Sequence, residues 1–137
     1  MGEYIRDLVK YIVGRDAVIH LSVPDIAIEM DHATDIGLII NELVTNASKY
    51  AFPFVDQPAI WVEATIKEQQ LFLTIRDNGP GFPANFSIEQ ISSFGLTSIV
   101  EMFVHKSGKG NLITYNKGGA VVQISMPFDL KTGKLVA

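Results

Sequence analysis

The sequence predicts an α/β (α+β) fold of two layers, in which a mixed, mostly antiparallel sheet is covered on one face by about three helices. Two observations lead to this fold class. Segments with apolar residues at helical spacing are interspersed with segments in which apolar and polar residues alternate, as in half-buried strands. Their order is helix, one or two strands, helix, two strands, a long loop, helix and two strands, which is typical of a layer of helices on a sheet.

Composition is typical of one globular domain. The chain has 137 residues, of which 47% are hydrophobic, and we expect a core at residues 5–128 and a tail at residues 129–137. A net charge of −4 argues against a nucleic-acid partner. The absence of cysteine excludes disulfides and thiolate metal sites, and no apolar run is long enough to span a membrane. We therefore expect a cytoplasmic domain that makes no membrane contact itself, whether or not the full-length protein is anchored.

The N-terminal segment is expected to form a helix and then a strand. Apolar residues recur at helical spacing over residues 4–13, and Gly14 provides a stop. Residues 17–23 alternate as a strand and are followed by the turn-forming pair Pro24 and Asp25. Residues 26–30 are compatible with a second, shorter strand.

The central helix is predicted at residues 31–50, with Asp31 as its N-cap and Pro53 just beyond its end. At about 100° per residue, one face is apolar and carries Ile36, Ile40, Leu43, Val44 and Ala47. Another face is polar and carries Asp35, Glu42, Asn46 and Lys49. A carboxylate, an amide and a cation one turn apart suit a hydrated metal ion beside phosphates. The alternative is a solvated face with helical charge pairs.

The remaining strands are predicted from four segments that alternate with period two and pair as two antiparallel hairpins: residues 59–66 with 71–76, and residues 111–115 with 120–126. The links at residues 67–70 and 116–119 have hairpin length. Residues 77–94 form the longest irregular stretch, and loops of this length are usually functional or mobile. A further helix is predicted at residues 96–104.

Asp77 ends a predicted strand and is followed closely by Gly79 and Gly81. Such a strand can hold a carboxylate at the floor of a pocket, where it accepts a hydrogen bond from an exocyclic amine such as that of adenine. The glycines would let the backbone lie close to the base. The alternative is an ordinary Asx turn with glycines at positive φ.

A third signal precedes the helix predicted at residues 96–104. Ser92 and Ser93 lie just ahead of Gly95 and Leu96, so free backbone N–H groups at the helix start could meet phosphate oxygens. The alternative is a glycine before a helix with a serine cap.

Together these three segments resemble a known family. Residues 41–52, 73–83 and 94–100 are similar to the N, G1 and G2 boxes of Bergerat-fold (GHKL) ATPases, and specifically of the catalytic ATP-binding domain of sensor histidine kinases. The resemblance covers residues 5–128. The HWE branch is set aside because Asn41 stands where that branch has histidine.

The resemblance implies roles for the polar face of the central helix. Asn46 would ligate Mg²⁺, which bridges the ATP phosphates. Glu42 would be a polarising or base-like group beside it, and Lys49 would face phosphate. Phosphoryl transfer requires mainly positioning and charge neutralisation, and these residue types meet that requirement.

The resemblance also implies roles for the loops. Asp77 would bind adenine, Gly79 and Gly81 would line the base pocket, and Phe82 would pack nearby. The lid over the triphosphate would be closed by Gly95 and Leu96. The chain departs from the family pattern in its short lid, in a second box with a single glycine, and in Ala120, which replaces a threonine that could support Asp77.

The function implied is transfer of the γ-phosphoryl group of ATP to a histidine on a separate dimerisation domain, which would pass it to a response regulator. His20, His32 and His105 are interpreted as structural or surface residues. The acceptor helices do not precede residue 4, so we expect a catalytic fragment. Three further functions are compatible with the same motifs: an ATPase that drives a conformational clamp with Glu42 as general base, an anti-sigma Ser/Thr kinase, and a regulator with a degenerate nucleotide site, which Ala120 suggests.

Overall fold

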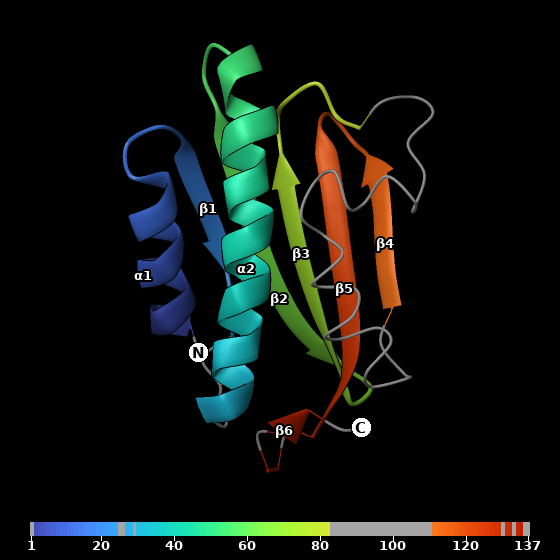
Figure 1. The fold of residues 1–137 in the computed structure, drawn as a ribbon. Helices are drawn as coiled ribbons and strands as arrows, with labels where there is room; N and C mark the ends of the chain where they lie inside the picture. Colours follow the sequence, from blue (N-terminus) through green and yellow to red (C-terminus); the bar gives the residue numbers. More distant parts are fainter. Residues whose placement is uncertain are drawn as a thin grey trace.

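The fold is organised on a mixed sheet with the strand order β1-β2-β3-β5-β4 (Figure 1). The computed structural model describes residues 2–24, 27–28, 30–82, 111–129, 131–132 and 134–135. Its elements are α1 Gly2–Val13, β1 Val18–Ser22, α2 Met30–Tyr50, the 3-10 helix η1 Phe52–Phe54, β2 Ala59–Lys67, β3 Gln70–Asp77, β4 Asn111–Asn116, β5 Ala120–Asp129 and β6 Lys134–Leu135. β1 pairs with β2 in parallel, and the other neighbours pair antiparallel. The predicted fold class is confirmed.

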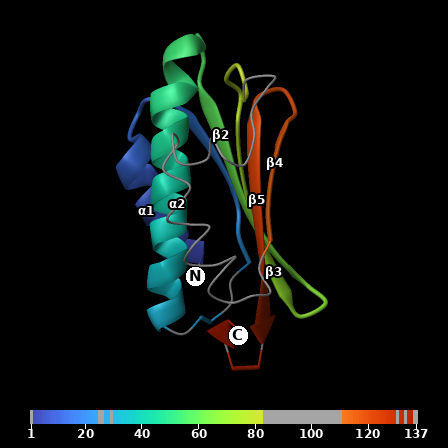
Figure 2. The ribbon, with the colours of Figure 1, turned by 45° about the vertical axis from the view of Figure 1, so that its right-hand side comes forward.

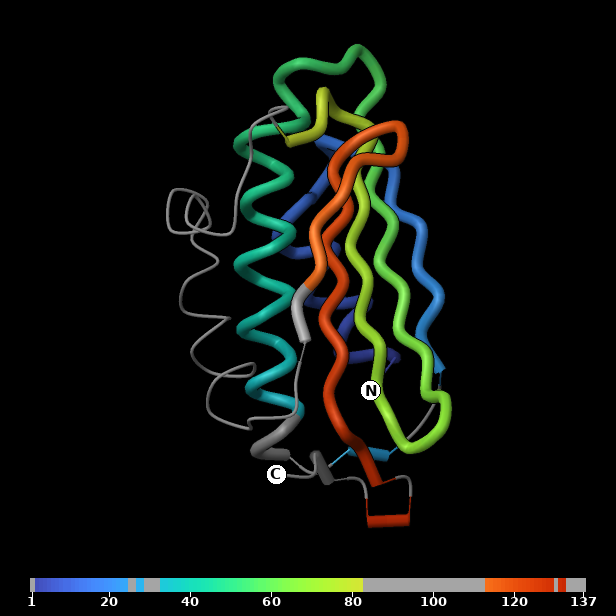
Figure 3. Tube along the Cα trace, turned by 90° about the vertical axis from the view of Figure 1, so that its right-hand side faces the viewer, coloured from blue at the N-terminus to red at the C-terminus, as the bar shows by residue number. Residues whose placement is uncertain are grey.

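Both α-helices lie on one face of the sheet, as the turned views show (Figure 2, Figure 3). The opposite face carries no helix among the described residues. Each helix needs one apolar face for this arrangement, and the predicted apolar positions of α2 are all buried. The helices therefore form the second layer of the predicted sandwich.

The hydrophobic core lies between these two layers. In α1 the buried residues Ile5, Val9 and Val13 recur every fourth position. The strands contribute alternate residues, as expected for a sheet with one covered face. These inward residues are Ile60, Val62, Ala64, Leu71, Leu73, Ile75, Val122, Ile124, Met126 and Phe128.

The start of α2 differs from the prediction. The helix begins at Met30, so Asp31 lies within it and is not its N-cap. Ala27 and Ile28 form no strand, and Ile28 packs against the core from an irregular segment. An apolar side chain can be buried without strand pairing, and its spacing alone does not distinguish the two cases.

Both predicted hairpins are confirmed. β2 and β3 pair from Lys67 opposite Gln70, and β4 and β5 pair from Asn116 opposite Ala120. In the first turn Glu68 and Gln69 have φ of 53° and 62°. Positive φ at both central residues is the conformation that matches the twist of two-residue hairpins.

Part of the predicted tail at residues 129–137 is described by the structure. Asp129 is the last residue of β5, and its Oδ1 accepts a hydrogen bond of 2.9 Å from the backbone N–H of Lys131. This turn brings β6 back onto β5, with Leu135 opposite Phe128. Hydrophobic spacing does not reveal this backbone pairing of Lys134 and Leu135 with β5.

Two predictions cannot be compared with the structure. The helix predicted at residues 96–104 and the irregular stretch from residue 83 onward lie outside the described residues. Among the helices that the structure does describe, none combines the length and the apolar character needed to cross a membrane.

The packing of α2 on the sheet predicts the effect of a core truncation. Ile40→Ala is expected to lower the free energy of unfolding by about 2–5 kcal/mol, because the fully buried side chain would leave a cavity. Urea unfolding monitored by circular dichroism measures the loss. Leu38→Ala, on the same helix but 48% exposed, is the control and should cost less than about 1 kcal/mol. Equal losses would contradict this packing.

Candidate functional site

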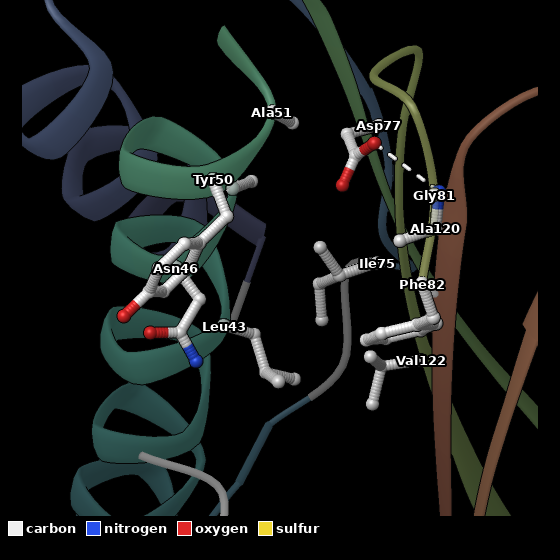
Figure 4. A pocket seen from close by; sticks show the side chains of 11 residues that line it. Leu43, Asn46, Tyr50, Ala51, Ile75, Asp77, Gly81, Phe82, Ala120 and Val122 are labelled. Atoms are coloured by element: carbon white, nitrogen blue, oxygen red, sulfur yellow. Dashed lines mark hydrogen bonds between the residues drawn. The ribbon is translucent and has the colours of Figure 1, made fainter. Parts of the chain in front are cut away.

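A pocket lies between the C-terminal half of α2 and the facing ends of β3 and β5 (Figure 4). It encloses about 520 Å³, including space open to solvent. The residues that line it are mostly apolar: Leu43, Asn46, Ala47, Tyr50, Ala51, Ile75, Asp77, Gly81, Phe82, Ala120 and Val122. Such a lining suits a flat, largely apolar ligand with a few polar groups.

The helix supplies one wall of the pocket. Leu43, Asn46, Ala47 and Tyr50 are three or four residues apart, so they fall on one side of α2. The side chains of Asn46 and Tyr50 stand on this wall, across the pocket from Asp77 (Figure 4). Since Leu43 and Ala47 also belong to the buried core, packing on the sheet holds the position of this wall.

Asp77 supplies the polar group of the opposite wall. It is the last residue of β3 and is only 7% exposed. Its Oδ1 accepts hydrogen bonds from the backbone N–H groups of Gly79, at 2.9 Å, and Ala120, at 3.2 Å. The second carboxylate oxygen points into the pocket (Figure 4). One oxygen is thus held by the protein, and the other faces the pocket.

The protonation of Asp77 depends on this environment. Burial raises the pKa of Asp77 above its ordinary value, and the hydrogen bonds from Gly79 and Ala120 act in the opposite direction. Because burial is the larger effect, the charged carboxylate is stabilised incompletely by the protein alone. A ligand N–H group in the pocket would provide the additional donor.

Gly79 has a different position from the one predicted. It does not line the pocket but packs against Ala51 at the end of α2, where a Cβ on residue 79 would lie 2.5 Å from the Cβ of Ala51. Its backbone N–H supports Asp77. Glycine is therefore required here for contact between the loop and the helix, which sequence spacing could not distinguish from contact with a base.

The polar face of α2 is divided by helical geometry. Relative to Asn46, Leu43 and Tyr50 lie about 40–60° around the helix in one direction, and Glu42 and Lys49 lie about 40–60° in the other. Asn46 consequently lines the pocket, whereas Glu42 and Lys49 do not. Glu42 is half-buried and Lys49 exposed, so both flank the pocket on the outer side of Asn46.

The other predicted site residues fall into two groups, those that line the pocket and those that lie outside the described residues. Asp77, Gly81 and Phe82 line the pocket, as does Asn46. Gly95 and Leu96 lie outside the described residues. Ala120 lacks the hydroxyl of the threonine that it replaces, but its backbone N–H donates to the Asp77 carboxylate.

A magnesium ion would find few protein ligands here. The described residues contain no group of three or more His, Cys, Asp or Glu that could hold a metal. Asn46 presents an amide oxygen, and the Glu42 carboxylate lies one helical turn away. Mg²⁺ commonly takes one or two protein oxygens and completes its shell with phosphate and water, so these residues fit a metal that arrives with a phosphorylated ligand.

Two asparagines that sequence reasoning missed hold the pocket loops. The side chain of Asn78 accepts a 2.9 Å hydrogen bond from the N–H of Ala59 and donates one of 2.9 Å to the carbonyl of Gln57. Asn116 makes a similar pair of bonds to Phe82. In the sequence, an asparagine at the end of a strand indicates a turn. Its hydrogen-bond partners, 19 to 34 residues away, are determined by the fold.

The histidine whose side chain the structure describes, His20, does not line the pocket. His20 is exposed on β1 and stacks on Trp61, with ring centroids 5.0 Å apart and an interplanar angle of 10°. This stack lies on the uncovered face of the sheet. The side chain of His32 and all of His105 lie outside the described residues.

Comparison with known proteins identifies similar chains. The sequence is 26% identical over 132 residues to blue-light-activated histidine kinase 2 of Erythrobacter litoralis, covering 93% of this chain and 38% of the relative. It is 31% identical over 87 residues to an anti-sigma F factor of Bacillus licheniformis, covering 64% of this chain and 56% of the relative. The chain therefore spans less than two thirds of either relative.

A solved structure shows the same fold. The catalytic domain of histidine kinase ThkA matches with a TM-score of 0.75 and 20% identity, covering 91% of this chain and 90% of that domain. Residues 31–130 match the family described as histidine kinase-, DNA gyrase B-, and HSP90-like ATPase. The family that the sequence resembles is thereby confirmed, and the chain belongs to this family of ATPases.

Proposed function

We propose that this chain binds ATP with Mg²⁺ and is the catalytic domain of a histidine kinase. It would transfer the γ-phosphoryl group to a histidine on a separate dimerisation domain, from which a response regulator would receive it. One observation carries the proposal: Asp77 is buried at the floor of an apolar pocket with one oxygen directed into the pocket, opposite Asn46. The activity would be cytoplasmic, where ATP is available.

The pocket has the properties needed for adenine. The ionised Asp77 accepts hydrogen bonds but cannot donate one, so it favours the exocyclic amine of adenine over a carbonyl at the same ring position. Ile75, Val122 and Leu43 provide apolar contact for the ring. Phe82 and Tyr50 add aromatic surface to the same walls. Burial of the base and a single polar contact would together position the nucleotide.

The phosphates would extend from this pocket along the outer side of α2. We assign Asn46 as the protein ligand of Mg²⁺, with Glu42 as a polarising group and Lys49 as a cation for phosphate. The ion, when bound, neutralises charge on the phosphates. The lid roles of Gly95 and Leu96 remain predictions of the family resemblance. In this arrangement the domain positions the γ-phosphate and leaves the acceptor to a partner.

An anti-sigma Ser/Thr kinase is the second candidate. The similarity to the anti-sigma F factor over 87 residues supports it, and the nucleotide pocket would be the same. The acceptor would then be a hydroxyl of a partner protein. The two candidates differ in the chemistry of the product and not in that of the pocket.

A regulator with a degenerate nucleotide site and a clamp ATPase have less support. The degenerate site was suggested by Ala120, whose backbone N–H nevertheless supports Asp77. The clamp ATPase would use Glu42 as a general base beside the phosphates, where the kinase proposal also places this residue, and neither relative compared above is named as a clamp ATPase.

Nucleotide binding is the most direct prediction. Asn46→Ala should weaken ATP binding about tenfold or more in the presence of Mg²⁺, and should change it little without Mg²⁺, because its proposed partner is the ion. Asp77→Ala should weaken binding under both conditions. Isothermal titration calorimetry measures both effects. Asn41→Ala, at an exposed position of the same helix, is the matched control. If neither variant differs from that control, the site assignment is wrong.

The raised pKa of Asp77 predicts a pH dependence. The carboxylate takes up a proton at a higher pH than an ordinary aspartate, whose pKa is about 3.9, and protonation would weaken its acceptor role. ATP affinity of the wild type should therefore fall relative to that of Asp77→Asn as the pH is lowered from neutral. Titration of the ATP phosphates affects both proteins equally, so the ratio of their affinities at several pH values, measured by calorimetry, isolates the effect of protonating Asp77. A constant ratio would contradict this role.

The reaction class can be tested with the full-length protein that contains this chain. Incubation with ATP labelled on the γ-phosphate should give a protein-bound label that acid removes and alkali does not, as expected for phosphohistidine. Asn46→Ala should abolish the label. An acid-stable label on a partner protein would favour the anti-sigma kinase. Release of labelled phosphate without protein labelling would favour a clamp ATPase.

A further inference from the structure

The side chain of Asn116, the last residue of β4, holds the backbone of Phe82. Its Oδ1 accepts a 2.8 Å hydrogen bond from the N–H of Phe82, and its Nδ2 donates a 3.1 Å bond to the Phe82 carbonyl. A residue of a neighbouring strand would satisfy the same two groups with its backbone. The Asn116 amide thus pairs with the Phe82 backbone as the backbone of an adjacent strand would, although the two residues are 34 positions apart in the sequence.

The contact with Asn116 restricts which residue can stand at position 81. Its φ is +82°, a conformation that favours glycine, and a Cβ at this position would lie 2.7 Å from Oδ1 of Asn116. Both constraints come from the protein itself. The need for glycine at position 81 is therefore explained by the approach of Asn116, without a nucleotide.

The same turn also supports Asp77. Asn116 is paired with Ala120 in the β4–β5 ladder, and the N–H of Ala120 donates to the Asp77 carboxylate. The two ends of one hairpin turn consequently hold the two parts of the pocket wall, the carboxylate and the Gly81–Phe82 backbone. Displacement of this turn would affect both parts together.

We propose that Asn116 is a positioning residue for nucleotide binding: its side-chain amide fixes Gly81 and Phe82 against the pocket before the nucleotide arrives. This inference rests on the proposed function. The two hydrogen bonds are solvent-exposed, so they contribute little to the stability of the whole fold. Their effect is local, because without them the Phe82 segment would have to be ordered when the ligand binds.

The test compares Asn116→Ala with Lys117→Ala. Lys117 belongs to the same turn but its side chain faces a hollow on the uncovered side of the sheet. Asn116→Ala should weaken binding of ATP with Mg²⁺ about three- to tenfold by calorimetry, and Lys117→Ala should not. Hydrogen exchange measured by NMR should show that the Phe82 amide loses protection only in Asn116→Ala. The midpoints of urea unfolding should remain close to that of the wild type.

A double-mutant cycle separates this role from a general structural one. Gly81→Ala should weaken ATP binding less in the Asn116→Ala background than in the wild type, because the added methyl group no longer meets the amide. Additive effects would overturn the proposal, as would unchanged ATP affinity or unchanged Phe82 protection in Asn116→Ala. In those cases the proposed function would stand if the wild type binds ATP. Absence of ATP binding by the wild type would overturn both.

Discussion

The buried carboxylate of Asp77 is the constraint on which the rest of the site depends. A charge in this position is costly unless hydrogen bonds stabilise it, and two backbone N–H groups supply them. One comes from the turn that follows β3, and the other from the start of the neighbouring strand β5. The carboxylate can therefore remain in the pocket only if the turn at Gly79 and the β3–β5 register are both correct. Binding chemistry and strand pairing are linked through one side chain.

Helix α2 makes the second half of this arrangement because it belongs to the core and to the pocket at once. Leu43 and Ala47 are packed in the core and also line the pocket. The same packing fixes the rotation of the helix, which brings Asn46 to the edge of the cavity and leaves Glu42 and Lys49 beyond it. Under the proposed function, a metal ion and phosphates would then extend from the buried base toward solvent, where a partner could receive the γ-phosphoryl group.

The uncovered face of the sheet is stabilised differently. His20 on β1, Trp61 on β2 and Arg76 on β3 form a stack across three strands, with the Arg76 guanidinium 4.0 Å from the centroid of the Trp61 ring. Cross-strand aromatic and cation–π contacts of this kind stabilise a sheet without a covering layer. The arrangement gives β1, which pairs with a single strand within the described sheet, a side-chain link to the sheet in addition to its parallel ladder.

Sequence alone determined the fold class, both hairpins and the apolar face of α2, because periodicity and turn chemistry are local properties of the chain. It also proposed Asn46 and Asp77 as site residues, and both line the pocket. It did not reveal that Asn78 and Asn116 bind distant backbone groups, or that Ala120 supports Asp77 through its N–H. It also could not tell that Gly79 packs on Ala51 or that Glu42 and Lys49 fall outside the pocket lining. These features follow from which segments the sheet brings together and how α2 is rotated upon it, and only tertiary packing decides both.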